Sequence, residues 1–377
     1  MEENKLKKCA IISLYGNENY GNKLQNYAVC EIVKKYKIIP EVIRYEHYEI
    51  DINYHKDYTK IFRFKYVLKK IKKYLKNRKY KIQQEKRLRS FLQFNKLINY
   101  SEFVIKDKER LKMMNQKYDY FLFGSDQIWN IGAFRFYDLA FGTYFDKDKN
   151  FSLSASFGIE KIPDEYRKKY VQGISNMKNI SVREAAGKKI VEDLINRKDV
   201  SVLVDPTMLI KKEEWIKISK KPENMFNEKY ILNYFLGELT RKEKNNIVDF
   251  ANKNNMKIIN ILDEKDPFYK CGPAEFIYLE KNASLIFTDS FHSCVFGILM
   301  ETPFIVFERK DENTSINSRL DTLLEKFKLQ KRRYKGIIDE KMLQCDYGKT
   351  ESIIQLERKK MYNYLKEIFK DKLENES

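Results

Sequence analysis

The chain has 377 residues, 43% of them hydrophobic, and it carries a formal net charge of +19. This length suits two domains rather than one ordinary core, while 13 Gly and 7 Pro leave little room for disordered linkers. The five Cys are scattered without a Cys-x-x-Cys pair, which argues against disulfides and a zinc site and favours reduced thiols. No run of about 18 apolar residues occurs, and the first apolar run is too short for the core of a signal peptide. We therefore expect a cytosolic protein, either soluble or peripheral to a membrane.

The first part of the chain alternates strand-like and helix-like segments, which is typical of α/β folds. The expected strands are apolar throughout, as buried parallel strands are. They are Lys8 to Leu14, Glu41 to Tyr45, Tyr118 to Phe123, Phe151 to Ala155, Ile180 to Val182 and Val200 to Val204. The expected helices are Lys23 to Tyr36, Asp164 to Met177 and Ala185 to Ile195.

Residues 60–89 hold fourteen Lys or Arg against one acid, Glu85. Apolar residues recur there at spacings of three and four, which predicts an amphipathic helix with a basic face. Such a helix can bind an anionic membrane surface or the pyrophosphate of a lipid-linked glycan. The alternative is a solvated helix in a Lys-rich protein. A basic stripe also suits nucleic acid, but no recognition motif accompanies it and we expect no nucleic-acid partner.

The second part repeats the alternation after a polar, Lys-rich stretch from Lys211 to Lys229, which we interpret as a linker. The expected elements are strand Tyr230 to Leu236, helix Thr240 to Asn254, strand Met256 to Ile261, helix Pro273 to Lys281, strand Ser284 to Phe287, helix Phe291 to Met300 and strand Phe304 to Phe307. A last helix is expected from Ile353 to Leu373.

The chain has three His, and His292 is the one that lies between an apolar strand and an apolar helix. A His at that junction points into the crevice where open α/β sheets bind ligands, and imidazole suits proton transfer near neutral pH. The alternative is a helix-capping segment in which Asp289 or Ser290 is the cap and His292 only packs.

Other polar residues also follow strand ends. Asp126, with Ser125 and Asn130 beside it, can accept a proton from an attacking hydroxyl or form an Asx turn. Arg183 can bind a phosphate or carboxylate with two prongs or pair with Glu184. The loop from Gly16 to Asn22 can hold an anion at a helix N-terminus or serve as a structural turn, but it lacks the glycine order of a dinucleotide site.

Six blocks of the sequence together resemble the polysaccharide pyruvyl transferase family. They are Asn19-Tyr20-Gly21-Asn22, Gly124-Ser125-Asp126-Gln127-Ile128-Trp129-Asn130, Ser156-Phe157-Gly158, Ser181-Val182-Arg183-Glu184, Asp205-Pro206-Thr207, and Thr288-Asp289-Ser290-Phe291-His292 with the later Thr302-Pro303-Phe304-Ile305-Val306. The resemblance implies an α/β fold with two Rossmann-like domains facing a cleft, in a glycosyltransferase B-like arrangement. The expected parts are residues 1–210 with a basic helical insertion at about 60–98, residues 211–345 carrying the His292 motif, and residues 346–377 packing back on the N-terminal domain.

The resemblance also implies a reaction. The pyruvyl group of phosphoenolpyruvate would move onto a sugar of a cell-surface or lipid-linked glycan as a ketal, with release of phosphate and with no cofactor or metal. His292 would be the acid and Asp126 the base, with Asp289 as its substitute or as the group that orients His292. Arg183 is the first choice to bind the donor. The other expected contacts are Asn19, Gly21, Asn22, Ser125 and Ser290 for the donor, and Trp129 and Asn130 for the acceptor, although Trp129 also fits a core anchor.

The chain departs from the family pattern at three positions. Many members have Arg where this chain has Ser290, so we expect Arg309 or Arg319 to supply the missing cation. Asn22 replaces the usual acid, which leaves a hydrogen-bonding role there, and Ser293 replaces a frequent Gly. Two other functions stay open: a glycosyltransferase that uses a nucleotide sugar, and a catalytically silent glycan-binding protein.

Overall fold

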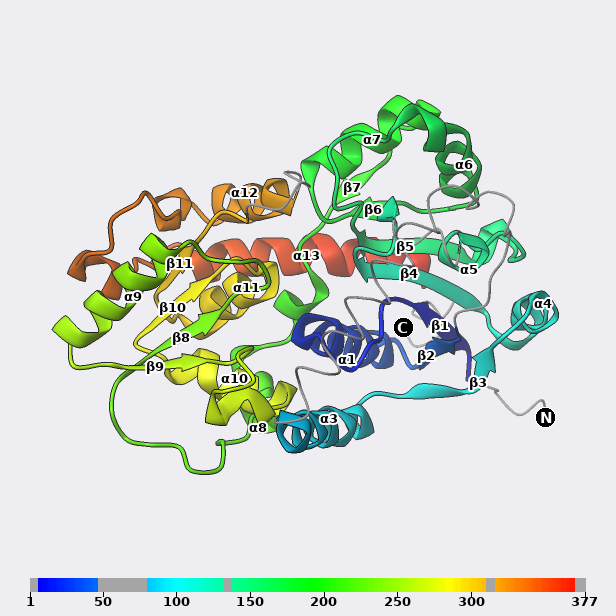
Figure 1. The fold of residues 1–377 in the computed structure, drawn as a ribbon. Coiled ribbons are helices and arrows are strands. Elements are labelled where there is room, and N and C mark those ends of the chain that lie inside the picture. The colour runs from blue at the N-terminus through cyan, green and yellow to red at the C-terminus, as the bar shows by residue number, and fades with distance from the viewer. Residues whose placement is uncertain (1–5, 47–79, 132–136, 310–315, 370–377) are drawn as a thin grey trace.

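The computed structural model describes residues 6–46, 80–131, 137–309 and 316–369. Within these residues the chain is an α/β protein with two parallel sheets, each formed by a separate part of the chain (Figure 1). The fold class expected from the sequence is therefore confirmed. Most of the basic segment 60–89 lies outside the described residues, and only its last part is seen, in helix α3 (Lys81–Phe94).

The first sheet has seven strands in the order β3-β2-β1-β4-β5-β6-β7 within the described residues. They are β1 (Lys8–Ile12), β2 (Ile39–Tyr45), β3 (Tyr100–Ile105), β4 (Tyr120–Asp126), β5 (Asn150–Ala155), β6 (Ser181–Val182) and β7 (Ser201–Val202). The helices in this part are α1 (Tyr20–Lys34), α3, α4 (Lys108–Lys117), α5 (Tyr137–Ala140), α6 (Asp164–Ser175) and α7 (Ala185–Ile195). Because the strands are parallel, the residues that follow them gather at one edge.

The second sheet has four strands in the order β11-β10-β8-β9. They are β8 (Tyr230–Tyr234), β9 (Lys257–Asn260), β10 (Leu285–Thr288) and β11 (Phe304–Val306). The accompanying helices are α8 (Lys212–Ile218), α9 (Arg241–Lys253), α10 (Pro273–Asn282), α11 (Phe291–Met300), α12 (Ile316–Lys326) and α13 (Thr350–Ile368).

Helix α11 is buried along its whole length, which explains why its sequence is apolar on every side. It begins after Ser290 and ends at Glu301, whose φ of 58° places it in the left-handed region. Near the end of the helix, a Cβ at Gly297 would lie 2.7 Å from the Phe304 ring, so only glycine permits this approach to β11. The helix therefore holds His292, in its first turn, in a fixed position.

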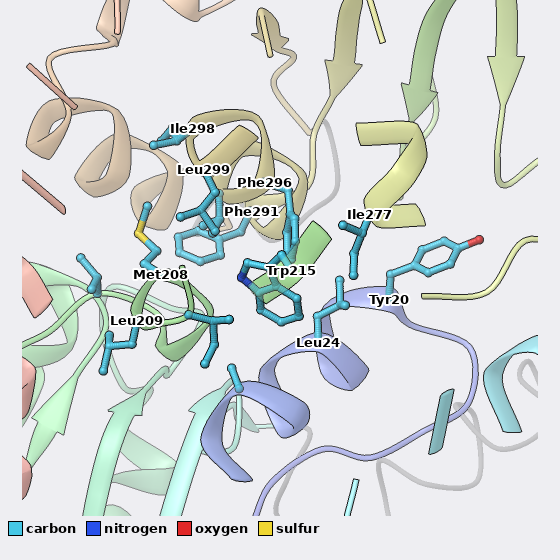
Figure 2. Close-up of a cluster of buried hydrophobic side chains, with 14 of the residues drawn as sticks. Tyr20, Leu24, Met208, Leu209, Trp215, Ile277, Phe291, Phe296, Ile298 and Leu299 are labelled. Carbon is cyan, nitrogen blue, oxygen red and sulfur yellow. The ribbon is translucent and has the colours of Figure 1, made fainter. Parts of the chain in front are cut away.

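The two parts of the chain share one apolar core. Trp215 is fully buried and packs among Leu24 of α1, Ile277 of α10 and Phe296 of α11 (Figure 2). The Trp215 indole also donates to the Thr207 carbonyl at 3.1 Å. The stretch from residue 211 to 229 is therefore more than a polar linker, because it contains helix α8 and this core residue.

Helix α13 reaches from the second sheet across to the first (Figure 1). The Tyr364 hydroxyl donates to the Ser152 carbonyl of β5 at 2.7 Å, and Phe369 packs on Tyr120 and Phe151. None of the described helices combines the length and apolarity needed to cross a bilayer.

Candidate functional site

Arg183, which follows β6, is the centre of a buried charge cluster. Its side chain is 1% exposed, and its guanidinium donates to Asp205 Oδ2 at 2.9 Å and to Asp126 Oδ1 at 3.3 Å. The Phe291 ring covers one face of the guanidinium, with its centroid 4.3 Å from Cζ. Glu184, the partner considered from the sequence, is more distant, with its Oε2 4.0 Å from Arg183 Nε. Arg183 is thus committed to two carboxylates that lie far from it in sequence.

Asp205, to which no role was assigned from the sequence, lies between Arg183 and His292. Its Oδ2 also lies 3.5 Å from His292 Nε2, while its Oδ1 accepts from the Thr207 amide and hydroxyl at 3.1 and 2.7 Å. Burial opposes ionisation of this carboxyl, but His292 and Arg183 outweigh burial and hold its pKa well below the usual range. Asp205 is therefore an ionised carboxylate that faces the imidazole.

The expectation that Asp289 orients His292 is wrong, because Asp205 occupies that place. The Asp289 carboxylate accepts from the amides of Leu236 and Gly237, at 2.7 Å each, and pairs with Arg309 Nε at 3.0 Å. These contacts tie the end of β10 to the loop after β8. Arg309 is consequently engaged with Asp289 rather than left for a ligand.

Arg319 lies in the first half of α12 and approaches Asp126 from the other side. Its Nη1 is 4.0 Å from Asp126 Oδ1, and its Nη atoms donate to the Gln127 amide oxygen at 2.7 and 2.8 Å, in the amide orientation that satisfies both groups. Burial, followed by the charge of Arg183, lowers the pKa of Arg319 to about 10. Arg319 is therefore a buried cation whose nearest carboxylate, Asp126, lies 4.0 Å away and also pairs with Arg183.

Asp126 lies between these two arginines at the end of β4. Burial raises its pKa, but Arg183, His292 and Arg319 together outweigh burial and lower it below the ordinary value. Its side chain is 10% exposed. The carboxylate is thus held ionised.

The N-terminus of α1 packs directly against His292. A Cβ built on Gly21 would lie 2.1 Å from His292 Nδ1, so a side chain at this position would displace the imidazole. Asn19 caps the helix, and its side chain accepts from the Asn22 amide at 3.2 Å. Helix α11 also begins here, so two helix N-termini, which favour anions, converge on His292.

Three other expected contacts form hydrogen bonds within the protein. Ser125 is fully buried, and its hydroxyl donates to Asp205 at 3.0 Å. Trp129 is also fully buried, stacks on Phe141 and donates to the Ala140 carbonyl at 3.2 Å. The expected acceptor contact at Trp129 is therefore wrong, and Trp129 is the core anchor. The Asn130 side chain donates to the Phe157 carbonyl at 3.0 Å.

Buried polar atoms without hydrogen-bond partners gather at this site. Nine such side-chain atoms occur among the described residues, and five belong to this region: Asn22 Oδ1, Arg183 Nε, Glu184 Oε2, His292 Nε2 and Arg319 Nε. Buried polar groups are normally paired, so their concentration here points to a polar ligand that would complete their hydrogen bonds.

Ser290 is buried at the start of α11, and its backbone amide donates to the Thr288 hydroxyl at 3.0 Å.

Comparison with known proteins gives a family match. The sequence profile of the family described as polysaccharide pyruvyl transferase matches residues 19–311, which include each of the site residues named above except Arg319. No curated protein sequence matches the chain significantly.

Solved structures give weaker similarities. The UDP-GlcNAc 2-epimerase of Methanocaldococcus jannaschii, in complex with UDP-GlcNAc and UDP, is 15% identical with a TM-score of 0.46, covering 93% of this chain and 99% of that one. The UDP-GlcNAc 2-epimerase of Neisseria meningitidis bound to UDP-GlcNAc is 12% identical with a TM-score of 0.46, covering 94% and 100%. An alpha-glucosyltransferase in complex with UDP and DNA is 9% identical with a TM-score of 0.41, covering 96% and 95%.

Proposed function

Because the chain belongs to the polysaccharide pyruvyl transferase family, we propose that it moves the pyruvyl group of phosphoenolpyruvate onto a glycan sugar as a cyclic ketal and releases phosphate. The observation that supports this best is the gathering of unpaired buried polar atoms around His292. Phosphoenolpyruvate carries a phosphate and a carboxylate, and both would find cationic or N–H donors there. The acceptor is a sugar of a cell-surface or lipid-linked glycan.

Arg319 is the donor-binding cation in this proposal, in place of Arg183. Both Nη atoms of Arg183 already donate to carboxylates, one to Asp205 and one to Asp126. A ligand would have to break one of these buried ion pairs to bind Arg183. Both arginines keep an unpaired Nε, but the nearest carboxylate contact of Arg319 is 4.0 Å long, so a ligand can reach Arg319 without breaking a close ion pair. The N-termini of α1 and α11 add backbone N–H groups for the second anionic group of the donor.

His292 supplies the proton that starts the reaction. A proton passes from the imidazole to the methylene carbon of phosphoenolpyruvate, which becomes a methyl group and leaves an oxocarbenium-like centre at C2. The first sugar hydroxyl bonds to C2 and loses its proton. The C2–O bond to phosphate then breaks, and the second hydroxyl bonds to C2 and loses its proton, giving the ketal and free phosphate. Asp205 Oδ2 lies 3.5 Å from His292 Nε2 and orients the imidazole.

Asp126 is the base for the sugar hydroxyl. Its lowered pKa keeps it ionised and ready to accept a hydrogen bond, although the same shift makes it a weak base. The hydroxyl becomes much more acidic as its oxygen bonds to the oxocarbenium carbon, so a weak base suffices at that moment. Arg183 and Arg319 hold the carboxylate in place.

Ligand-dependent melting tests the proposal against its alternatives. Phosphoenolpyruvate should raise the melting temperature, whereas nucleotide sugars should not. The reverse result would favour a glycosyltransferase, and a response to neither would favour a silent glycan-binding protein. Phosphorus NMR then tests the chemistry: free phosphate should appear only when phosphoenolpyruvate and the glycan acceptor are both present, and His292→Gln should abolish most of it.

A further inference from the structure

A cavity lies apart from the His292 site and shares no residue with it. Its volume is about 320 Å³, and it opens between the end of α1, the 3₁₀ turn η5 (Pro206–Leu209), the start of α8 and helix α13. Four cationic side chains line it, Lys35, Lys211, Arg358 and Lys359, and no Asp or Glu is among the lining residues of the described chain. Such a lining favours an anion.

The remaining polar lining suits a sugar. Asn363 offers an amide, Gln355 offers an amide oxygen because its Nε2 donates to Glu351, and Tyr362 offers a ring and a hydroxyl to which Lys35 Nζ donates at 3.3 Å. Amides that read hydroxyl groups, beside an aromatic ring, are the usual polar contacts of a small polar ligand. The volume is at the lower end of the roughly 300–1,000 Å³ of ligand pockets, which fits one or two sugar rings.

Arg358 is the buried cation of this cavity. The residue is 8% exposed, and its guanidinium donates to the carbonyls of Met208 at 2.9 Å and Ile210 at 3.1 Å. Within the described residues it forms no ion pair with a carboxylate, and burial lowers its pKa although the more distant charges of Glu351, Glu214 and Glu213 act in the opposite direction. A bound anion would supply a close countercharge.

We propose that this cavity binds a phosphorylated sugar, with the phosphate between Lys211, Arg358 and Lys359 and the ring beside Tyr362. The site lies outside the transfer chemistry proposed above and does not depend on it. It does touch the same turn: η5 starts at Asp205, which faces His292, and ends at Leu209, which lines the cavity. Occupancy therefore stabilises the turn that positions Asp205.

Calorimetric titration with glucose 6-phosphate, inorganic phosphate and glucose tests the site. Glucose 6-phosphate should bind more tightly than either of the other two, and its affinity should fall as salt rises. The double variant Lys211→Ala, Lys359→Ala should bind glucose 6-phosphate about tenfold or more weakly than the wild type, because two of the cations that contact the phosphate are lost. Lys366→Ala is the matched control, since this exposed Lys lies on the same helix but does not line the cavity. The control should bind as the wild type does.

Binding must also persist in His292→Gln, which separates this cavity from the first site. Absence of binding, equal binding of glucose, or equal binding by the double variant would overturn the proposal. Loss of binding in His292→Gln would overturn it as well, because the probe would then occupy the first site. Circular dichroism confirms that each variant is folded.

Discussion

Replacing Asp205 by Asn removes one charge from the site with almost no change in volume. Asp205 Oδ1 stays a carbonyl oxygen because Thr207 donates to it twice, so the new amide nitrogen takes the place of Oδ2. That nitrogen, a donor, would then face Arg183 Nη1, another donor, at 2.9 Å. The side chain is fully buried, and removing one partner of a buried ion pair costs about 3–5 kcal/mol. We expect Asp205→Asn to lose that much unfolding free energy at pH 7.

Urea unfolding, followed by circular dichroism and by the fluorescence of Trp129 and Trp215, measures this loss. Asp199→Asn is the control: this carboxylate also pairs with an arginine, at 2.7 Å, but is 67% exposed, so the loss should stay below about 1 kcal/mol. Folding lowers the pKa of Asp205, so its contribution is fully present above the unfolded value of about 3.9 and declines as pH falls below it. The difference in unfolding free energy between the wild type and Asp205→Asn should therefore decrease below about pH 4. A difference under about 1 kcal/mol between the two unfolding free energies at pH 7 would show that the buried pair of Asp205 and Arg183 does not supply this stability.

Three further predictions concern catalysis, packing and binding. His292→Gln should lower turnover by about 10²-fold or more while the circular dichroism spectrum is kept, and near-normal turnover would reject the acid role. Gly21→Ala should cost about 1–3 kcal/mol and reduce turnover because its Cβ would meet the imidazole, whereas Gly16→Ala, with nothing within 4 Å, should change neither quantity in unfolding and activity assays. Residues 60–89 should bind anionic vesicles in flotation assays and release them as salt rises, and equal binding to neutral vesicles would reject this.

The elements that the sequence predicted best are those whose apolar runs are continuous. Strand β5 and helix α11 fall within one residue of the expected bounds, because both are buried on all sides. Strand β3 was missed: its sequence, Tyr-Ser-Glu-Phe-Val-Ile, mixes polar and apolar residues, as an edge strand allows. Trp215 also escaped notice because a single aromatic residue in a Lys-rich stretch carries no periodic signal.

The sequence predicted which residues form the site better than it predicted which of them contact each other. His292, Asp126 and Arg183 do come together, since each lies at or just after the carboxyl end of a parallel strand. The partner of His292 could not be read from the sequence, because Asp205 and Asp289 both follow strands and the contact depends on how the two sheets face each other. The available signal for Asp205 was its position after β7, at the same edge as Arg183.

Calorimetric titration with phosphoenolpyruvate tests whether this molecule is the donor. Arg319→Lys keeps the charge but loses the planar guanidinium, so the affinity should fall by about tenfold or more. Arg309→Lys is the matched control, because Arg309 pairs with Asp289 and should leave donor affinity nearly unchanged. We expect the wild type and the control to bind phosphoenolpyruvate, and Arg319→Lys to bind it clearly more weakly. The proposed donor is wrong if the wild type does not bind phosphoenolpyruvate, and the role of Arg319 is wrong if Arg319→Lys binds it as tightly as the wild type does.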